Sequence, residues 1–238
     1  MKANLAYGPK KTGDPKCMLW FLPYRNLAWP GTKNLKNDKL VNDMLKATPR
    51  PLSVTKLANE FIIKFLKDKK FVGIHWRFDE NYEFHCKVSA GIGNKKACSH
   101  ILGHGFDLKD ISKRMLDKFK IWQGKGWVED RVDKVFIAAP PNSNITVKGL
   151  AKNLEGSGIE VFWSENLMEF IKEKFKNCDA SKFFEQIHDF VSQVEQEICY
   201  QSQFFVMSWG SSWSDAVVIE RRARKTNHTG IVNFDEFF

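Results

Sequence analysis

Two short stretches of the sequence carry side chains suited to binding an anion. In the first, the apolar run Phe71-Val-Gly-Ile leads directly into His75, Trp76 and Arg77. In the second, an apolar run is followed by Trp209-Gly-Ser-Ser-Trp-Ser, which places hydroxyls and a glycine where a helix begins. The guanidinium of an arginine matches a phosphate, and the free N–H groups of a helix N-terminus also favour an anion. Together the two stretches predict a site for a nucleotide diphosphate.

Each stretch also has a purely structural interpretation. Arg77 could form an ion pair with a surface carboxylate such as Asp79, and Ser212 or Ser214 could simply be the N-cap of the helix. Spacing alone does not choose between these alternatives. The binding site is favoured because both stretches end a strand of one predicted sheet.

The elements around these stretches alternate between short apolar runs and amphipathic segments. Strands are predicted at 71–76, 134–139, 159–163 and 204–207, and helices at 53–67, 107–122, 146–155, 164–175, 181–200 and after 213, with Asp107 and Ser164 as N-caps. This alternation indicates an α/β fold, a Rossmann-like parallel sheet with helices on both faces. Ligands of such sheets bind beyond the carboxyl ends of the strands, where both stretches lie. The segment 78–106, rich in glycine and histidine, is predicted as a long loop.

The chain is expected to have two parts, an irregular N-terminal segment (1–52) and the Rossmann-like domain (53–238). An apolar fraction of 43% is that of an ordinary globular protein. The net charge of +9 suits an anionic partner, but no nucleic-acid-binding motif accompanies it, and the core accounts for the aromatic residues. No apolar run is long enough to span a bilayer, and no secretory signal peptide is legible.

Both stretches resemble the GDP-fucose protein O-fucosyltransferase family, particularly its members that act on EGF-like repeats. The run 71–77, with Asn81 and Cys86 following at four and nine positions from Arg77, is similar to the His-x-Arg strand end of that family. The run 193–222 is similar to its final strand, Ser-Ser-aromatic turn and closing Glu-Arg helix, and 134–139 to its middle strand. The resemblance covers residues 53–224.

The resemblance implies the C-terminal lobe of a GT-B glycosyltransferase. The activity implied is a peptide-O-fucosyltransferase, which transfers fucose with inversion from GDP-fucose to a Ser or Thr of a folded, disulfide-rich secreted repeat. No Asp-x-Asp motif is present, in keeping with a family that needs neither a metal nor another cofactor. The implied location is the lumen of the endoplasmic reticulum or Golgi.

The family pattern also assigns roles to individual residues. Arg77 would be catalytic, holding the β-phosphate and stabilising the charge that develops on the leaving GDP. Glu195 stands where the family more often has an aspartate near the guanine. The substrate-binding residues implied are His75, Trp76, Arg77, Glu195, Ser211, Ser212 and Trp213.

Cys86 and Cys98 could form a disulfide, as similar enzymes do in an oxidising lumen, and closing this ring would stabilise the fold by about 3 kcal/mol. A zinc site with His85, His100 and His104 is the alternative, although the spacing matches no common structural site. The sequons that begin at Asn144 and Asn227 are candidates for N-glycosylation. His188, among apolar helix positions, is interpreted as structural.

One feature of the family is missing. Nothing before residue 53 resembles the glycine-rich Gly-x-x-x-Asn turn of its N-terminal half. The alternative function is therefore a non-catalytic module that binds a GDP-sugar or another protein, in a truncated chain or a pseudoenzyme. The sequence does not decide between these functions, nor does it identify the acceptor repeat.

Overall fold

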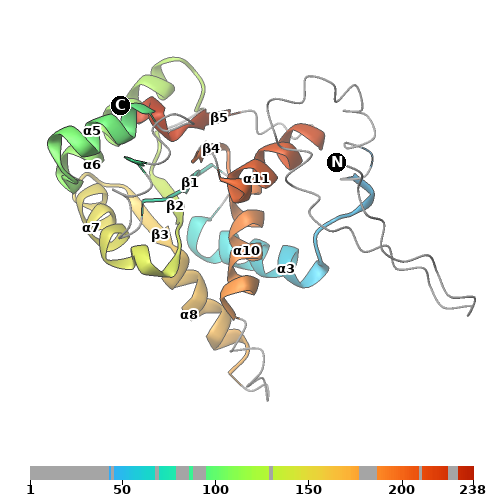
Figure 1. Ribbon diagram of the computed structural model, residues 1–238. Helices are drawn as coiled ribbons and strands as arrows, with labels where there is room; N and C mark the ends of the chain where they lie inside the picture. Colours follow the sequence, from blue (N-terminus) through green and yellow to red (C-terminus); the bar gives the residue numbers. More distant parts are fainter. Residues whose placement is uncertain are drawn as a thin grey trace, which may run out of the picture.

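Five short strands form one parallel sheet in the order β3-β2-β1-β4-β5. This computed structural model describes residues 43, 46–67, 70–78, 86–87, 95–128, 131–176, 187–208, 211–224 and 230–238. The strands are β1 (Val72–His75), β2 (Lys134–Ala138), β3 (Glu160–Trp163), β4 (Phe204–Met207) and β5 (Gly230–Asn233). The predicted α/β class is confirmed, because the sheet is parallel and helices surround it (Figure 1).

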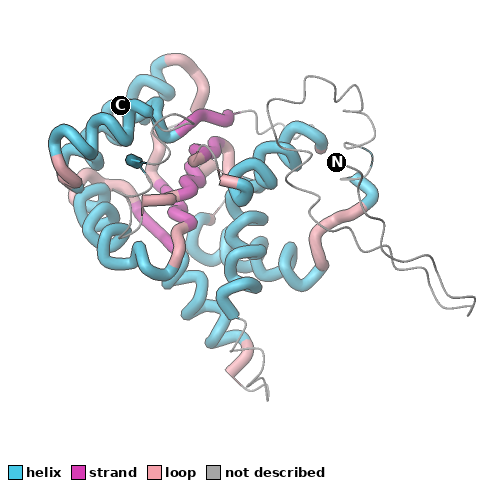
Figure 2. Tube along the Cα trace, in the orientation of Figure 1, coloured by secondary structure: helices cyan, strands magenta, loops and turns pink. Residues whose placement is uncertain are grey.

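Helices cover both faces of this sheet. On one side lie α5 (Lys95–His104), α6 (Leu108–Gly124), α7 (Asn144–Glu155) and the 3₁₀ turn η3 (Phe234–Phe237); on the other lie α3 (Leu52–Phe61), α8 (Ser164–Lys174), α10 (Ile187–Gln201) and α11 (Ser212–Ala223) (Figures 1 and 2). A π-helical turn, Ile62–Leu66, extends α3, and a 3₁₀ turn, Pro141–Ser143, precedes α7. Each side has its own apolar cluster, because alternate side chains of every strand point to opposite faces.

Most elements have the predicted limits, and the differences have local causes. Asp107 caps α6 as predicted, its carboxylate accepting from the backbone N–H of Lys109 and of Asp110. Helix α8 begins at Ser164 itself, so its N-cap is Trp163 and the prediction of Ser164 as the cap is wrong. Two elements were missed, strand β5 and helix α5, the latter inside the predicted loop.

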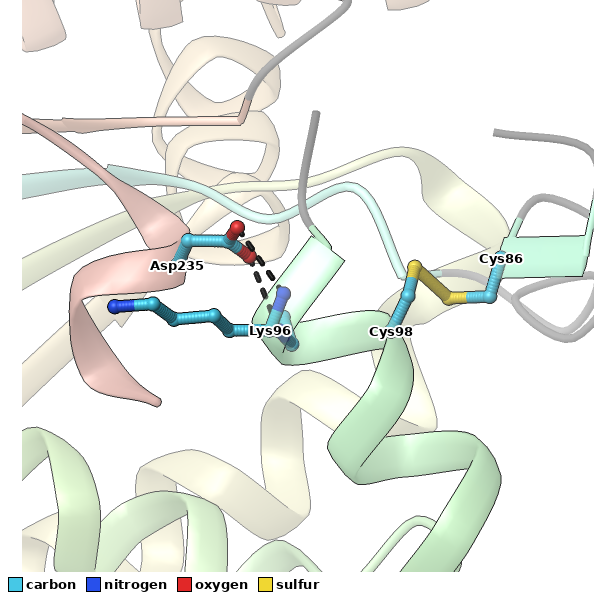
Figure 3. The surroundings of a disulfide bond; sticks show 5 residues. Cys86, Lys96, Cys98 and Asp235 are labelled. Carbon is cyan, nitrogen blue, oxygen red and sulfur yellow. Dashed lines mark hydrogen bonds between the residues drawn. A yellow bond between two sulfur atoms is a disulfide. The ribbon is translucent and has the colours of Figure 1, made fainter. Parts of the chain in front are cut away.

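Helix α5 is held by contacts that are distant in the sequence. The carboxylate of Asp235 in η3 accepts from the backbone N–H of Lys96 (3.2 Å) and of Ala97 (3.0 Å), and a disulfide joins Cys98 to Cys86 (Figure 3). A carboxylate at a helix N-terminus satisfies free N–H groups and interacts favourably with the helix dipole. The helix therefore depends on tertiary partners that its own weak periodicity does not reveal.

A buried arginine ties the last helix to the sheet. Arg221 of α11 is only 2% exposed, and burial lowers its pKa to about 10, so it remains charged at neutral pH. Its guanidinium donates to the backbone carbonyls of Cys199, Tyr200, Ser202, Gln203 and Gly230. These carbonyls belong to the end of α10, to the two residues before β4 and to the first residue of β5, so one side chain connects α11 to three other elements.

We predict that Arg221→Ala lowers the free energy of unfolding by about 3 kcal/mol, because it leaves several buried carbonyls without a donor. Urea denaturation followed by circular dichroism measures the change. The matched control is Arg222→Ala, one position along the same helix, whose side chain is exposed and whose loss should cost less than about 0.5 kcal/mol. Equal effects of the two substitutions would contradict this role of Arg221.

Candidate functional site

A cavity of about 380 Å³ lies at the carboxyl edge of the sheet. Its walls come from the ends of β1 and β2, from the segment between β2 and α7, and from helices α8, α10 and α11. The cavity thus occupies the place where open α/β sheets bind their ligands.

The three predicted site residues at the end of β1, residues 75–77, do not all lie on the same face of the sheet. His75 and Arg77 line the cavity, and the Arg77 side chain is exposed. Trp76 points to the opposite face, where it is fully buried against Phe78 and Phe234. The expectation that Trp76 lines the pocket is therefore corrected, because successive side chains of an extended chain alternate between faces.

His75 is held tightly where it enters the cavity. Its ring stacks on the indole of Trp213, with 4.3 Å between ring centroids, and its Nδ1 lies 2.7 Å from the hydroxyl oxygen of Ser214. Burial, together with the nearby charge of Arg77, lowers the pKa of His75 to about 3. The imidazole is therefore neutral at physiological pH and adds no charge to the site.

Helix α11 presents its N-terminus to the cavity. Ser211 is its N-cap, which corrects the interpretation of Ser212 or Ser214 as the cap, and the Ser211 side chain makes no capping hydrogen bond. Ser211, Ser212 and Trp213 all line the cavity, and the Trp213 indole N–H donates to the Ser192 hydroxyl (2.9 Å).

Two more helices begin at the same cavity. The first residues of α7 and α8, Asn144 and Ser164, are among its lining residues. Three helix N-termini and the guanidinium of Arg77 therefore border one space, and each of them favours an anion.

Glu195 gives the cavity a buried acid. It lies on α10, is 6% exposed, and its Oε1 has no hydrogen-bond partner within the described ranges. Burial raises the pKa of Glu195 to about 8, and a hydrogen bond with Ser164 opposes this shift only in part. A buried carboxyl with an unused oxygen is suited to meeting N–H donors on a ligand.

The structure also brings residues to the cavity that the sequence analysis missed. His188, interpreted as structural, lines it together with Asp189 and Ser192 of α10. A signal was present, since residues 188, 192 and 195 are spaced by four and three and so share one helix face. Three polar residues on one stripe of an otherwise apolar helix indicate a face that does not pack in the core.

The remaining predicted sites are distributed as follows. The disulfide between Cys86 and Cys98 is not part of the cavity lining, and no group of three metal-ligating side chains gathers among the described residues to support the zinc alternative. Asn144 lines the cavity, so a glycan there would share the space with any ligand. Asp79, Asn81, His85 and Asn227 lie outside the described residues. No helix in the described part of the chain is long and apolar enough to cross a membrane.

We predict that Glu195 makes the stability of the ligand-free protein fall as the pH rises. Its folded pKa, about 8, is above the ordinary value of 4.5, so the folded form holds a proton that the unfolded form releases. The stabilisation is complete below the ordinary pKa and is lost as the pH rises through the folded pKa. Between pH 5 and pH 8 the loss should be about 3 kcal/mol.

Urea denaturation across this range, compared with Glu195→Gln, isolates the effect. The amide cannot ionise, so the difference in stability between the two proteins should change with pH. A constant difference would mean that Glu195 titrates normally.

Comparison with known proteins identifies the family. The model of the GDP-fucose protein O-fucosyltransferase family matches residues 36–224. Among curated proteins no sequence matches significantly.

Similar solved structures include crystal structures of POFUT1. The complex with GDP has a TM-score of 0.47 and 18% identity, covering 82% of this chain and 49% of the other. The complex with GDP-fucose has a TM-score of 0.45 and 19% identity, covering 82% and 50%. This chain thus spans about half the length of the POFUT1 chains. Since the family model matches well over half of its residues, the chain belongs to the GDP-fucose protein O-fucosyltransferase family.

Proposed function

We propose that the cavity binds GDP-fucose and that the chain supplies the nucleotide-sugar-binding half of a peptide-O-fucosyltransferase. The observation that carries the proposal is the composition of the cavity wall. Arg77 and the start of α11 offer donors to a diphosphate, and the buried carboxyl of Glu195 offers an acceptor to a base in the same cavity. Family membership supports GDP-fucose as the donor.

In this proposal Arg77 acts on the diphosphate. The acceptor hydroxyl attacks the anomeric carbon of fucose from the face opposite GDP and loses its proton to solvent. The bond from that carbon to the β-phosphate oxygen breaks, and GDP leaves with the electron pair. A guanidinium beside this oxygen stabilises the developing charge more than it stabilises the intact donor, which is the requirement for lowering a barrier. The hydroxyls and N–H groups of Ser211 and Ser212 would bind the same diphosphate. The step needs no metal ion, because the arginine and the helix N-terminus supply the positive field.

Glu195 is proposed to recognise the guanine. The Watson–Crick edge of guanine carries the N1–H and the N2 amino group side by side, and one carboxylate can accept from both. Glu195 must lose its proton to do so, because only the ionised carboxylate offers acceptors at both oxygens. Adenine has no such pair of donors, so this contact would select the base.

The acceptor and the location follow from the family rather than from the cavity. We propose a Ser or Thr of a folded EGF-like or similar disulfide-rich repeat as acceptor, and the lumen of the endoplasmic reticulum or Golgi as the place of reaction. The disulfide between Cys86 and Cys98 supports an oxidising compartment.

A second candidate is a module that binds a GDP-sugar without transferring it. The described cavity supports it as well, because Arg77, Glu195 and the start of α11 can bind a nucleotide-sugar whether or not the sugar is transferred. A transfer assay with GDP-fucose and a folded EGF-like repeat separates the two candidates. Both bind the nucleotide, but only the transferase forms fucosylated repeat together with an equal amount of GDP.

We predict that Arg77→Ala weakens GDP binding by about 30-fold, or about 2 kcal/mol, as expected when a charged donor to a phosphate is lost. Isothermal titration calorimetry measures the dissociation constant. The matched control is Arg131→Ala, because Arg131 is also exposed but lies ahead of β2 at the opposite edge of the sheet, where it donates to Ser157 O (3.3 Å). GDP binding of equal strength in all three proteins would contradict the proposed contact between Arg77 and the diphosphate.

We also predict that the chain prefers GDP to IDP by about 10-fold, because IDP lacks the N2 amino group that Glu195 would accept from. Glu195→Gln should reduce this preference, since its amide has only one acceptor oxygen. Competition titrations with GDP, IDP and ADP give the ratios. An unchanged ratio in Glu195→Gln would show that the base contacts other groups.

A further inference from the structure

Ser214 is fully buried on α11, one residue beyond the predicted Ser-Ser-aromatic turn, and it makes no contact with the cavity. Its hydroxyl oxygen lies between two nitrogens, the backbone N of Ser208 at 3.0 Å and Nδ1 of His75 at 2.7 Å. The hydroxyl therefore joins the end of β4 to the end of β1 through α11.

The hydrogen-bonding capacities of these groups fix the direction of each bond. The Ser208 N–H can only donate, so the Ser214 oxygen accepts it. The hydroxyl proton of Ser214 then needs an acceptor, and among the described residues the only one within reach is Nδ1 of His75. If Nδ1 carried the proton instead, the Ser214 oxygen would accept twice and its own proton would be left without a partner in a fully buried place, which is costly.

We propose that Ser214 is a positioning residue that holds His75 in the tautomer with its proton on Nε2, and thereby makes His75 a hydrogen-bond donor to the cavity. Nε2 has no hydrogen-bond partner within the described ranges, and His75 lines the cavity. The stacking of the ring on Trp213 fixes the orientation of the donor. The donor is uncharged, so it suits a carbonyl, hydroxyl or phosphate oxygen of the ligand at any physiological pH.

The tautomer can be measured without a ligand. Long-range ¹H–¹⁵N spectra of protein labelled with ¹⁵N-histidine separate a protonated ring nitrogen from an unprotonated one, and His75→Asn identifies the His75 signals. We expect Nε2 protonated and Nδ1 unprotonated in the unaltered protein. Protonation at Nδ1 would overturn the proposal.

Substitutions then test whether Ser214 is the cause. Ser214→Ala should let the proton redistribute between the two nitrogens, and Ser214→Thr, which keeps a hydroxyl, should restore the Nε2 tautomer. The matched control is Ser112→Ala on α6, since Ser112 is also a buried helix serine and donates only to the Leu108 carbonyl. An unchanged tautomer in Ser214→Ala, or a changed one in Ser112→Ala, would refute the assignment.

The consequence for ligand binding rests on the proposed function, and GDP titration tests it separately. We expect Ser214→Ala to weaken GDP binding by about 5-fold, with Ser214→Thr and Ser112→Ala close to the unaltered protein. If the unaltered protein does not bind GDP, the proposed function fails, while the spectra still decide the tautomer. If GDP binds and the tautomer is protonated at Nδ1, the proposed function stands and the role of Ser214 fails.

Discussion

Helix α10 lies so close to strand β1 that a Cβ on Gly73 would make contacts tighter than ordinary van der Waals distance, and its neighbours would have to shift slightly. A Cβ at this position would be 3.0 Å from the Ser202 hydroxyl and 3.3 Å from Cα of Cys199, at the end of the helix. This approach brings the polar face of α10, with Ser192 and Glu195, over the end of β1, where His75 and Arg77 emerge. If the helix stood farther away, the cavity would be wider and Glu195 would be hydrated. The position of α10 therefore determines both the shape of the site and the chemistry of its acid.

Buried charges hold this arrangement in place from two directions. Arg221 binds carbonyls at the end of α10 and along the entry to β4 and β5. Arg50, just before α3, forms ion pairs with Glu197 of α10 and Glu220 of α11. Charged side chains in such places stabilise a fold only when every partner is present, so they specify one arrangement of the helices more than they add to stability. The Glu-Arg pair of the closing helix thus has a structural role, although it lies next to the binding site in the sequence.

The electrostatics of the cavity suit a ligand that is anionic at one end and carries hydrogen-bond donors at the other. Arg77 and three helix N-termini favour negative charge in the ligand, whereas His75 is neutral and contributes no positive charge. An ionised Glu195 in the empty cavity would be buried without a partner, which is why its pKa is raised. A ligand with N–H donors would compensate the cost of ionisation, so binding and loss of the proton are coupled.

The sequence by itself determined the elements and the two stretches of the site. The apolar runs at β1, β2, β3 and β4 and the amphipathic helices are local patterns, and His75, Arg77 and Ser211–Trp213 could be recognised because they follow strands. Strand β5 and helix α5 were not predicted, since β5 is only half-buried and α5 depends on Asp235 and a disulfide. Only the tertiary structure decided which side chains meet. The alternation of side chains along β1 sends Trp76 into the core, and the packing of α10 brings His188 and Glu195 to the cavity. Packing also places the Ser214 hydroxyl against His75, 139 residues away in the chain. Contacts of this kind depend on distances between elements, and a local sequence pattern does not contain those distances.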